Sequence, residues 1–474
     1  MQGVGLTIEG IIIIMIFAAT LLILLFDKFD ATATALLALC MSSAVVFFSP
    51  NYNESFTSFV GNISWDTVLF VAAMMIVVSV ASSSGMFQYV ALILAKRSRG
   101  NPLSLLWMFT IFVFVISLFL DPLPTMIVMA PFTVEICRAI NVDPRPVLTA
   151  EIVVAVFASF PSVVGAVPNM VVVLTAKVDA GLMFITNLPL SVTLYAVTMP
   201  LLIRHYRADL VHAANYDATL LMMLEPAQMI KSRRDFYLSA VCMAILLTGF
   251  VIQLEPSLVA LVVASMMLVF THRNAKKLLR QLSWDTVFFL VGLFGVITAL
   301  NTTGIVETLV TGVSTLVGDN PYIAVLFMLW IPGVGFSMVD NVPLAALLAP
   351  LAEKFKLINL LVPYSLIVGT NIGVYLVPIG DASIIVAVNE TRRAGRPLRL
   401  LDLARFATPL GFLHLTMTTL YFFLALTAGL IFCVIVMAIS LFVIKRQLAT
   451  IGLRNGGPEE TSSSRTGRWR RSIR

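Results

Sequence analysis

The stretch SWDTVLF, residues 64–70, decides the fold, because it returns as SWDTVFF at residues 283–289. The shift of 219 residues then continues without a gap over turn-forming and polar positions. It carries Gly85 to Gly304, Asn101-Pro102 to Asn320-Pro321, Asp121 to Asp340, Pro124 to Pro343, and Ala130-Pro131 to Ala349-Pro350. After a small gap the match resumes with Val164-Gly165 and Ile379-Gly380. Agreement at so many turn residues indicates an internal repeat.

The composition of the chain places both copies of the repeat in a membrane. Of 474 residues, 59% are hydrophobic and 12% are charged, and the mean hydropathy is +0.97. Soluble proteins carry about 25% charged residues, so this chain lacks the polar surface of a water-facing globule. A disordered chain, a nucleic-acid-binding protein and a secreted disulfide scaffold fit these numbers poorly. We expect an all-α polytopic membrane protein.

Apolar runs predict ten or eleven membrane spans. A bilayer core of about 30 Å requires roughly 20 apolar residues as a helix. Such runs lie near residues 8–26, 31–48, 65–83, 146–176, 183–203, 236–254, 256–271, 284–300, 362–388 and 406–425. The run from Ala407 to Ile444 would make one helix of about 57 Å. A break near Thr427-Ala428-Gly429 would add an eleventh span, which we prefer.

Residues 103–138 and 322–356 differ from ordinary spans. Each has two apolar arms around a polar, proline-containing tip: Asp121-Pro122-Leu123-Pro124-Thr125 in the first and Asp340-Asn341-Val342-Pro343 in the second. Proline interrupts a helix, and an intramembrane Asp is costly unless it lines a cavity or has a partner. We therefore interpret both segments as re-entrant hairpins; the alternative is two spans joined by a short outside loop.

The two copies of the repeat are predicted to be inverted. Five crossings separate Trp65 from Trp284 if a hairpin does not cross, and inverted repeats with broken helices are typical of secondary transporters. The predicted domains are a first repeat at 1–203 (three spans, hairpin 103–138, two spans), a cytoplasmic linker at 204–235, a second repeat at 236–425 with hairpin 322–356 entering from outside, an extra span at 426–445, and a basic disordered tail at 446–474.

The basic residues predict the orientation. Most Lys and Arg fall on one side, whereas Lys177, Lys354 and Lys356 fall on the other. The positive-inside rule makes the first side cytoplasmic, with the N-terminus outside, the C-terminus inside and the chain in the plasma (inner) membrane. The net charge of +6 therefore describes orientation. It does not indicate a nucleic-acid partner. Membrane lipid is a candidate partner of the basic tail.

These motifs resemble the ion transporter superfamily, most closely the branch of arsenite permeases, the melanosomal P protein and D-type sodium/proton antiporters. The resemblance covers roughly residues 6–425 and is carried by these stretches: Gly85-Met86-Phe87, Ala95-Lys96-Arg97, Asn101-Pro102, Leu118-Phe119-Leu120-Asp121, Ala150-Glu151, Pro168-Asn169, Asp340-Asn341-Val342-Pro343, Gly369-Thr370-Asn371-Ile372-Gly373 and Pro378-Ile379-Gly380. It implies an elevator-type homodimer in which a scaffold holds a hairpin-bearing transport domain. It implies no cofactor beyond a coupling H⁺ or Na⁺. An ATPase subunit that energises transport is a further partner that the resemblance leaves open.

The chain departs from its relatives in the first repeat. The first tip lacks the usual Asp-Asn pair, and Gly165-Ala166-Val167-Pro168-Asn169 has no acidic residue after its glycine. The second repeat keeps Asp340-Asn341 and adds Gly380-Asp381-Ala382-Ser383, but has Ile384 where relatives often have Asn. Polar ligands are thus concentrated in the second half, and a symmetric two-sodium arrangement becomes doubtful.

The oxygen-rich residues at the tips and breaks form the candidate site, because hard cations and hydroxylated solutes bind carboxylate, amide and hydroxyl groups. The candidate ligands are Asp340, Asn341, Thr370, Asn371, Asp381 and Ser383, with Asp121, Thr125 and Asn169 from the first repeat. The candidate hinge residues are Gly165, Gly373, Gly380, Pro124 and Pro343. No metal site is predicted. For Asp121, the alternative to a ligand is a structural role as a helix cap. For Glu151, the alternative to a functional role is solvation at the lipid interface.

The leading function is proton-coupled efflux of an arsenite- or antimonite-like oxyacid, whose hydroxyls need hydrogen-bond partners. Sodium/proton antiport is the alternative, and an anion or dicarboxylate carrier a further one, although no cationic residue occurs at either tip. An intramembrane enzyme is disfavoured because HExxH, GxSxG and a paired Ser/His arrangement are absent from the sequence. A channel is disfavoured because the repeat is internal and inverted.

Overall fold

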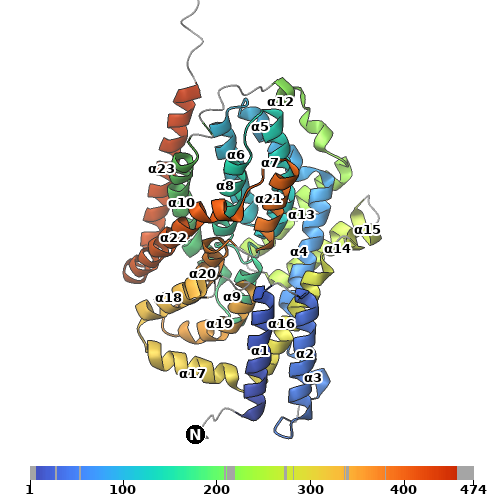
Figure 1. Cartoon of the computed structure of the whole chain (residues 1–474), viewed down its shortest axis with the longest axis vertical. Helices are drawn as coiled ribbons and strands as arrows, with labels where there is room; N and C mark the ends of the chain where they lie inside the picture. Colours follow the sequence, from blue (N-terminus) through green and yellow to red (C-terminus); the bar gives the residue numbers. More distant parts are fainter. Residues whose placement is uncertain are drawn as a thin grey trace, which may run out of the picture.

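The computed structural model describes residues 7–26, 29–52, 55–207, 210, 219–252, 254–271, 275–280, 282–335, 337, 341–378 and 381–455. These residues form helices and contain no strand (Figure 1). Six helices in the described ranges are long and apolar enough to cross a membrane, and six shorter apolar helices accompany them. The all-α polytopic membrane class is confirmed, whereas the count of ten or eleven spans stays a prediction.

The helices of the N-terminal half are α1 (Ile8–Phe26), α2 (Ala31–Phe48), α3 (Phe56–Gly61), α4 (Trp65–Ser84), α5 (Met86–Arg97), α6 (Pro102–Ser117), α7 (Pro122–Ala139), α8 (Arg145–Ala158), α9 (Val167–Thr175) and α10 (Ala180–His205). The connection to the second half contains α12 (Thr219–Met223) and the 3₁₀ turn η1 (Pro226–Met229). The C-terminal half contains α13 (Arg233–Val251), α14 (Pro256–Phe270), α15 (Ala275–Arg280), α16 (Trp284–Thr302), α17 (Ile305–Val317), α18 (Pro321–Trp330), the π turn η2 (Ile331–Gly335), α19 (Asn341–Phe355), α20 (Val362–Leu376), α21 (Ala382–Arg393), α22 (Leu400–Ala428) and α23 (Leu430–Asn455).

The repeated SWDTV motif builds the same local structure twice. The indole Nε1 of Trp65 donates to the Val60 carbonyl at 2.9 Å, and that of Trp284 donates to the Leu279 carbonyl at 2.8 Å. Each pair therefore ties a long helix to the short helix before it, α4 to α3 and α16 to α15. The acceptors are related by the same 219-residue shift as the tryptophans.

The turns that follow are also repeated. Gly85 and Gly304 have φ of +88° and +71°, a left-handed conformation that suits glycine, and each begins the next helix. Asn101 and Asn320 then cap α6 and α18, each accepting from the backbone amide two residues on. In Figure 1, α5 lies at the upper end of the molecule and its repeat equivalent α17 at the lower end.

Both predicted hairpins consist of two helical arms. The first is α6 and α7, separated at 118–121, and the second is α18 with η2 and then α19. In the second hairpin Pro332 lies in the π turn, where it removes a backbone donor and widens the helix. Part of the second tip, including Asp340, lies outside the described residues.

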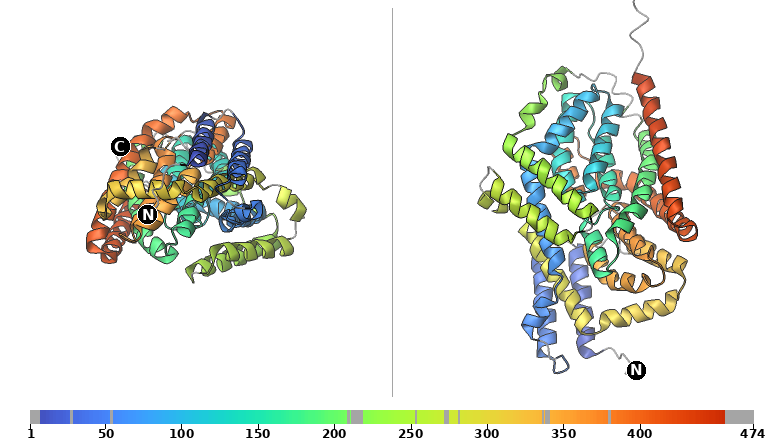
Figure 2. Two further views of the ribbon diagram at one scale, coloured as in Figure 1. Left: turned by 90° about the horizontal axis from the view of Figure 1, so that it is seen from below. Right: turned by 180° about the vertical axis from the view of Figure 1, so that it is seen from behind.

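The two predicted broken helices are confirmed as breaks. One is interrupted between α8 and α9, at residues 159–166, and the other between α20, which ends at Leu376, and α21, which begins at Ala382. The repeats pack crosswise at these breaks, because α7 lies against α21 and α19 lies against α9. A separate group is formed by α2 on α16 and by α13 and α14 on α4, which is seen from behind in Figure 2.

The C-terminal run is divided where the sequence predicts. Helix α22 ends at Ala428, Gly429 has φ of +68°, and α23 starts at Leu430. The predicted boundary at 445 between span and disordered tail is wrong for residues 446–455, which continue α23 to Asn455. Gln447, Leu448 and Ala449 favour helix, which explains the extension. Residues 456–474 lie outside the described residues.

Candidate functional site

Two buried asparagines join the broken helices at the centre of the molecule. Asn371 of α20 donates through Nδ2 to Oδ1 of Asn169 at 2.8 Å and to the Ile367 carbonyl at 2.7 Å. Asn169 of α9 donates through Nδ2 to the carbonyls of Ser159 and Ser162, both at 2.8 Å. Both carbonyls lie in the break, where each also accepts a turn amide, and Asn169 gives each a second hydrogen bond. Two predicted ligands from different repeats are thus in direct contact.

Glycine allows the first break to fold back on itself. A Cβ atom added at Gly165 would lie 2.3 Å from the Ser159 carbonyl oxygen, so no other residue fits without movement of the backbone. At Gly373 a Cβ would lie 3.3 Å from the Pro332 carbonyl oxygen, which is a closer approach than most residues allow. Gly380, the third predicted hinge glycine, lies outside the described residues.

Asp121 contacts the starts of two helices. Its Oδ1 accepts from the Leu123 amide of α7 at 3.0 Å, and its Oδ2 accepts from the Val167 amide of α9 at 3.3 Å. Pro122 and Pro124 contribute no amide hydrogen to this first turn, so Leu123 is the donor that the cap can reach. The partial positive charge at both helix starts favours a carboxylate here. Asp121 therefore caps a helix, as its structural alternative predicts, and the cap also ties the first hairpin to the first break; its role as a ligand stays a prediction.

Asp381 caps α21 in the second repeat. Its Oδ1 accepts from the backbone amides of Ser383 at 2.8 Å and Ile384 at 3.3 Å, and also from the Ser383 hydroxyl. Asp381 and Ser383 are thus paired as predicted ligands. Within the described ranges no hydrogen bond joins them to the Asn169–Asn371 pair.

The remaining predicted ligands differ in whether their polar groups have hydrogen-bond partners. The buried Thr370 hydroxyl bonds the Leu366 and Ile367 carbonyls of its own helix, each at 3.0 Å. The buried Thr125 hydroxyl of α7 has no hydrogen-bond partner among the residues that the structure describes. Asn341 and Pro343 lie in the first turn of α19, next to Asp340, which is outside the described residues.

Flanking helices support both breaks from outside. Ser191 and Asn187 of α10 donate to the Phe157 and Phe160 carbonyls, at 2.8 and 3.2 Å. Thr408 of α22 donates to the Leu376 carbonyl at 2.6 Å. Carbonyls near the interrupted helices therefore find partners on neighbouring helices, which is what allows irregular backbone at membrane depth.

Two buried polar groups lie outside the predicted set of ligands. His414 of α22 is fully buried, with Nδ1 2.7 Å from the Tyr375 hydroxyl and Nε2 3.0 Å from the Thr198 hydroxyl. Glu151 is also fully buried and accepts from the Thr133 hydroxyl at 2.7 Å, so solvation at the lipid interface is wrong for it. An ionisable residue inside a predicted span was the available signal for both.

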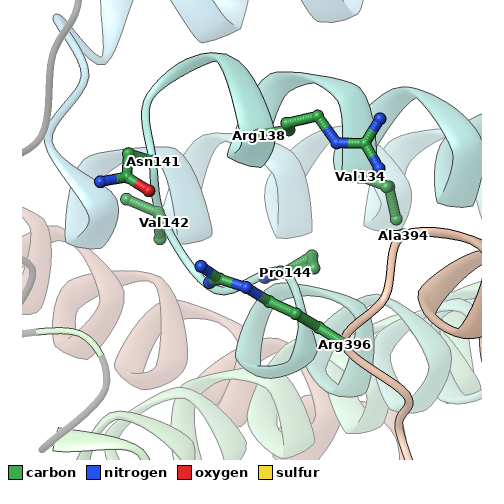
Figure 3. Close-up of a pocket in the computed structure, with 7 residues that line it drawn as sticks. All are labelled: Val134, Arg138, Asn141, Val142, Pro144, Ala394 and Arg396. Carbon is green, nitrogen blue, oxygen red and sulfur yellow. The ribbon is translucent and has the colours of Figure 1, made fainter.

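A basic pocket lies where the ends of α7 and α21 meet (Figure 3). This cavity of about 230 Å³ is lined by Val134, Arg138, Asn141, Val142, Pro144, Ala394 and Arg396. A second pocket shares Arg396 and adds Asp143, Arg145, Pro397, Arg399 and Asp402. In the part of the chain that the structure describes, neither Arg138 nor Arg396 forms an ion pair within 4 Å.

Asp143, in the loop between α7 and α8, is held as a carboxylate at the edge of these pockets. Arg145 binds it through Nε at 2.9 Å and Nη2 at 2.6 Å. Burial alone would raise the pKa of the Asp143 carboxyl, but the hydrogen bonds from Arg145 and the charges of Arg145 and Arg396 hold it below its ordinary value.

The helical membrane fold and its paired breaks define a membrane transporter of the ion transporter superfamily, not an enzyme. The chain belongs to the CitMHS family, described as citrate transporter, whose family model matches residues 21–358. The predicted superfamily membership is confirmed. The resemblance also extends over most of the chain, as three individual proteins demonstrate.

An uncharacterized transporter of Mycobacterium tuberculosis is 27% identical over 428 residues, which cover 88% of this chain and 98% of the relative. The P protein of Mus musculus is 22% identical over 515 residues, which cover 90% of this chain and 61% of the P protein. The crystal structure of the YdaH transporter of Alcanivorax borkumensis superposes with a TM-score of 0.55 at 15% identity, over 86% of this chain and 98% of that one. This last comparison establishes a shared fold.

Proposed function

We propose that this chain is a proton-coupled secondary transporter that works by elevator-type alternating access. The re-entrant hairpins and broken helices of two inverted repeats would form the moving domain, and the other helices would form the scaffold. Three observations support this arrangement: the repeated tryptophan and glycine geometry, the placement of α5 and α17 at opposite ends in Figure 1, and the crosswise packing of α7 on α21 and α19 on α9. Inverted repeats with broken helices are the usual architecture of such carriers.

The hydrogen bond between Asn169 and Asn371 carries the proposal. Both side chains are buried, and each comes from the broken helix of a different repeat. A hydroxylated solute inserted between them would replace one amide–amide bond by bonds to itself, so that binding changes the contact between the repeats. Asp121, which caps α7 and accepts from the first residue of α9, and Asp381, which caps α21, add carboxylate oxygens at the same two breaks.

The chemistry of this centre favours a neutral oxyacid such as arsenite or antimonite. Amide, carboxylate and hydroxyl groups are what a solute with several hydroxyls requires. The hydrogen bonds of Asn169, Asn371 and Asp381 within the described residues involve no Lys or Arg, so a bare polyanion would lack a counter-charge. We propose efflux as the direction, with the coupled proton moving inward.

A citrate-class carboxylate is the second candidate substrate. The family description favours it, and so does the pocket that contains Arg138 and Arg396, which offers two guanidinium groups to an anion. This pocket lies at the opposite ends of α7 and α21 from Asp121 and Asp381. It would therefore be an entry site, and the central site would still need a neutral or charge-compensated solute.

Transport by purified protein in liposomes with an imposed pH gradient tests the proposal. We expect arsenite to accumulate against its gradient, and a protonophore to abolish the accumulation. Citrate accumulation without arsenite movement would select the second candidate, and proton release on sodium addition alone would select sodium/proton antiport. The absence of saturable flux for all three solutes would overturn the transport site.

We also propose a homodimer with the N-terminus outside and the C-terminus in the cytoplasm. The family resemblance and the basic residues of the sequence support these two statements. Labelling of single cysteines introduced at Lys177 and at Arg393, with a membrane-impermeant thiol reagent, tests the orientation. Light scattering of the purified protein tests the dimer.

A further inference from the structure

We propose that Glu151 and Thr133 form a proton-binding site separate from the Asn169–Asn371 centre. The ligand is a single proton carried on the Glu151 carboxyl group. This inference rests on the proposed transport function and assigns the proton to a particular group. It follows from the burial of Glu151, its contacts and the position of the pair in the repeat.

The Glu151 carboxyl is enclosed between the first hairpin and the first broken helix. The side chain has no solvent exposure in α8, and its Oε1 accepts from the Thr133 hydroxyl of α7 at 2.7 Å. Its Oε2 has no hydrogen-bond partner within the described parts of the chain. An ionised carboxylate with one unsatisfied oxygen in such an interior is costly, and a protonated carboxyl is far less so.

Among the residues that the structure describes, the helices packed on α8 bring no compensating positive charge to Glu151. The helices packed on α8 are α6, α7, α10, α20 and α21. On α7, Cys137 is buried, whereas Glu135 and Arg138 are exposed. Helix α6 contains no titratable residue. The tyrosines of α10 and α20 bond elsewhere: Tyr195 to Thr110, Tyr375 to His414 and Tyr364 to the Asp179 carbonyl. Arg204 and His205, in the last turn of α10, are exposed, and Arg145 at the start of α8 pairs with Asp143. Glu390, Arg392 and Arg393 lie at the C-terminal end of α21. The carboxyl is therefore neutral in this conformation.

The equivalent place in the second repeat is apolar. The 219-residue shift carries Thr133 to Ala352, and alignment of Pro146 with Pro363 carries Glu151 to Val368. Ala352 and Val368 are both fully buried, and α19 packs on α20 as α7 packs on α8. At this position, packing in the second repeat is thus achieved without a carboxyl or a hydroxyl. Packing therefore does not explain why the first repeat has Glu151 and Thr133 here.

The basic pocket gives the proton a route out. Its lining includes Val134, the residue after Thr133, and Pro144, which precedes α8. Glu151 is seven residues beyond Pro144, about 10 Å along the helix. Separation of α7 from α8 would extend the pocket to Glu151, hydrate the carboxyl and expose it to the charges of Arg138 and Arg396. Both effects favour release of the proton.

The substitution Glu151→Gln tests this site, because glutamine has the shape of the protonated acid and cannot release a proton. Two measurements are made in liposomes on the substrate that the wild-type protein transports: exchange of labelled for unlabelled solute without a pH gradient, and accumulation driven by a pH gradient. We expect Glu151→Gln still to exchange solute but to lose gradient-driven accumulation at least tenfold. Glu353→Gln, an exposed glutamate paired with Lys177, is the matched control and should keep both activities.

Gradient-driven accumulation by Glu151→Gln at the wild-type level would overturn the site. Absence of exchange in the wild-type protein would instead overturn the proposed transport function, so the two failures are distinguishable. If Glu151→Gln does not fold, Thr133→Val carries the test. Loss of the hydroxyl that stabilises the ionised carboxyl should move the pH midpoint of accumulation upward by about one unit. An unchanged midpoint would refute the assignment.

Discussion

Asn371 and Asn169 are 202 positions apart in the chain, yet the Nδ2 of the first lies 2.8 Å from the Oδ1 of the second. Asn371 precedes the break in the second repeat, and Asn169 follows the break in the first. The bond therefore fastens two interrupted helices to each other close to their breaks. A solute that competes for either amide changes this connection directly, which links binding to rearrangement.

Asn371→Leu should reduce transport about tenfold or more. The substitution removes the donor to Asn169 and leaves a buried amide oxygen unsatisfied, at about 1–3 kcal/mol, and 1.4 kcal/mol corresponds to a factor of 10 in binding. Solute exchange and the melting temperature of the purified variant are the measurements. Asn301→Leu changes an exposed asparagine at the end of α16 and should leave exchange unaltered. Wild-type exchange by Asn371→Leu would show that the amide pair takes no part in binding.

Gly165→Ala should impair transport, whereas Gly312→Ala should not. The new methyl group at residue 165 would lie 2.3 Å from the Ser159 carbonyl oxygen, and forcing it in should cost about 1–3 kcal/mol. At Gly312, inside α17, nothing lies within 4 Å of the added Cβ, and alanine should stabilise the helix by up to about 1 kcal/mol. Melting temperatures and exchange rates of the two variants provide the comparison. Equal behaviour of both would mean that the break at 159–166 tolerates rearrangement.

The path of the backbone could be predicted from the sequence because turn residues act locally. Asn101 and Asn320 cap the helices that follow them, and Gly429 stops a helix, whatever the rest of the chain does. The hairpin arms and both breaks followed from such residues. The end of α23 did not, because basic residues near 445 suggest a helix end without enforcing one.

The partners of buried side chains could not be predicted in this way. Glu151 meets Thr133, and His414 meets Tyr375, only because of how each helix is rotated against its neighbour. Helices that are apolar all round give no pattern from which that rotation can be read. The contact between Asn169 and Asn371 has the same origin. Both residues were predicted as ligands, but the bond between them depends on crosswise packing of the repeats.

Tyr375→Phe should lower stability without abolishing transport. The substitution removes the hydroxyl 2.7 Å from His414 Nδ1 and leaves that buried nitrogen without its partner, at about 1–3 kcal/mol. We expect a lower melting temperature and exchange by the folded protein within about twofold of the wild type. Tyr237→Phe, at an exposed tyrosine of α13, is the control. Unchanged stability with lost exchange would instead place Tyr375 in the transport route.

Asp143→Asn should remove a pH-dependent part of the stability. The pKa of the Asp143 carboxyl is below its ordinary value of 3.8 in the folded protein, so its stabilisation is present above that value and is lost as the pH falls through the folded pKa. The variant should therefore melt below the wild type at neutral pH and approach it in acid, below about pH 4. Asp402 is more exposed than Asp143 and lies farther from its arginine, Arg405. The variant Asp402→Asn should therefore differ less from the wild type in melting temperature. A constant difference between pH 3 and 7 would contradict this account.

The double substitution Arg138→Gln and Arg396→Gln should distinguish the two candidate substrates. Both guanidinium groups line the pocket at the outer ends of α7 and α21, and neither forms an ion pair in the described ranges. An anion bound there would lose two charge-assisted hydrogen bonds, of about 1.5–3 kcal/mol each, so uptake of citrate at low concentration should fall at least tenfold. Arsenite is neutral, so its exchange without a pH gradient should stay within about twofold of the wild type.

The salt dependence of the same variant separates attraction from binding. If the arginines only raise the local concentration of an anion, citrate uptake by the wild type should fall toward the variant level at high ionic strength, because exposed charges are screened. If they bind the anion in the pocket, the difference should persist in salt. Arg405→Gln changes an exposed arginine outside both pockets and should have no effect. Equal loss of arsenite and citrate transport would show instead that the pocket holds α7 and α21 together, since both substrates depend on that contact.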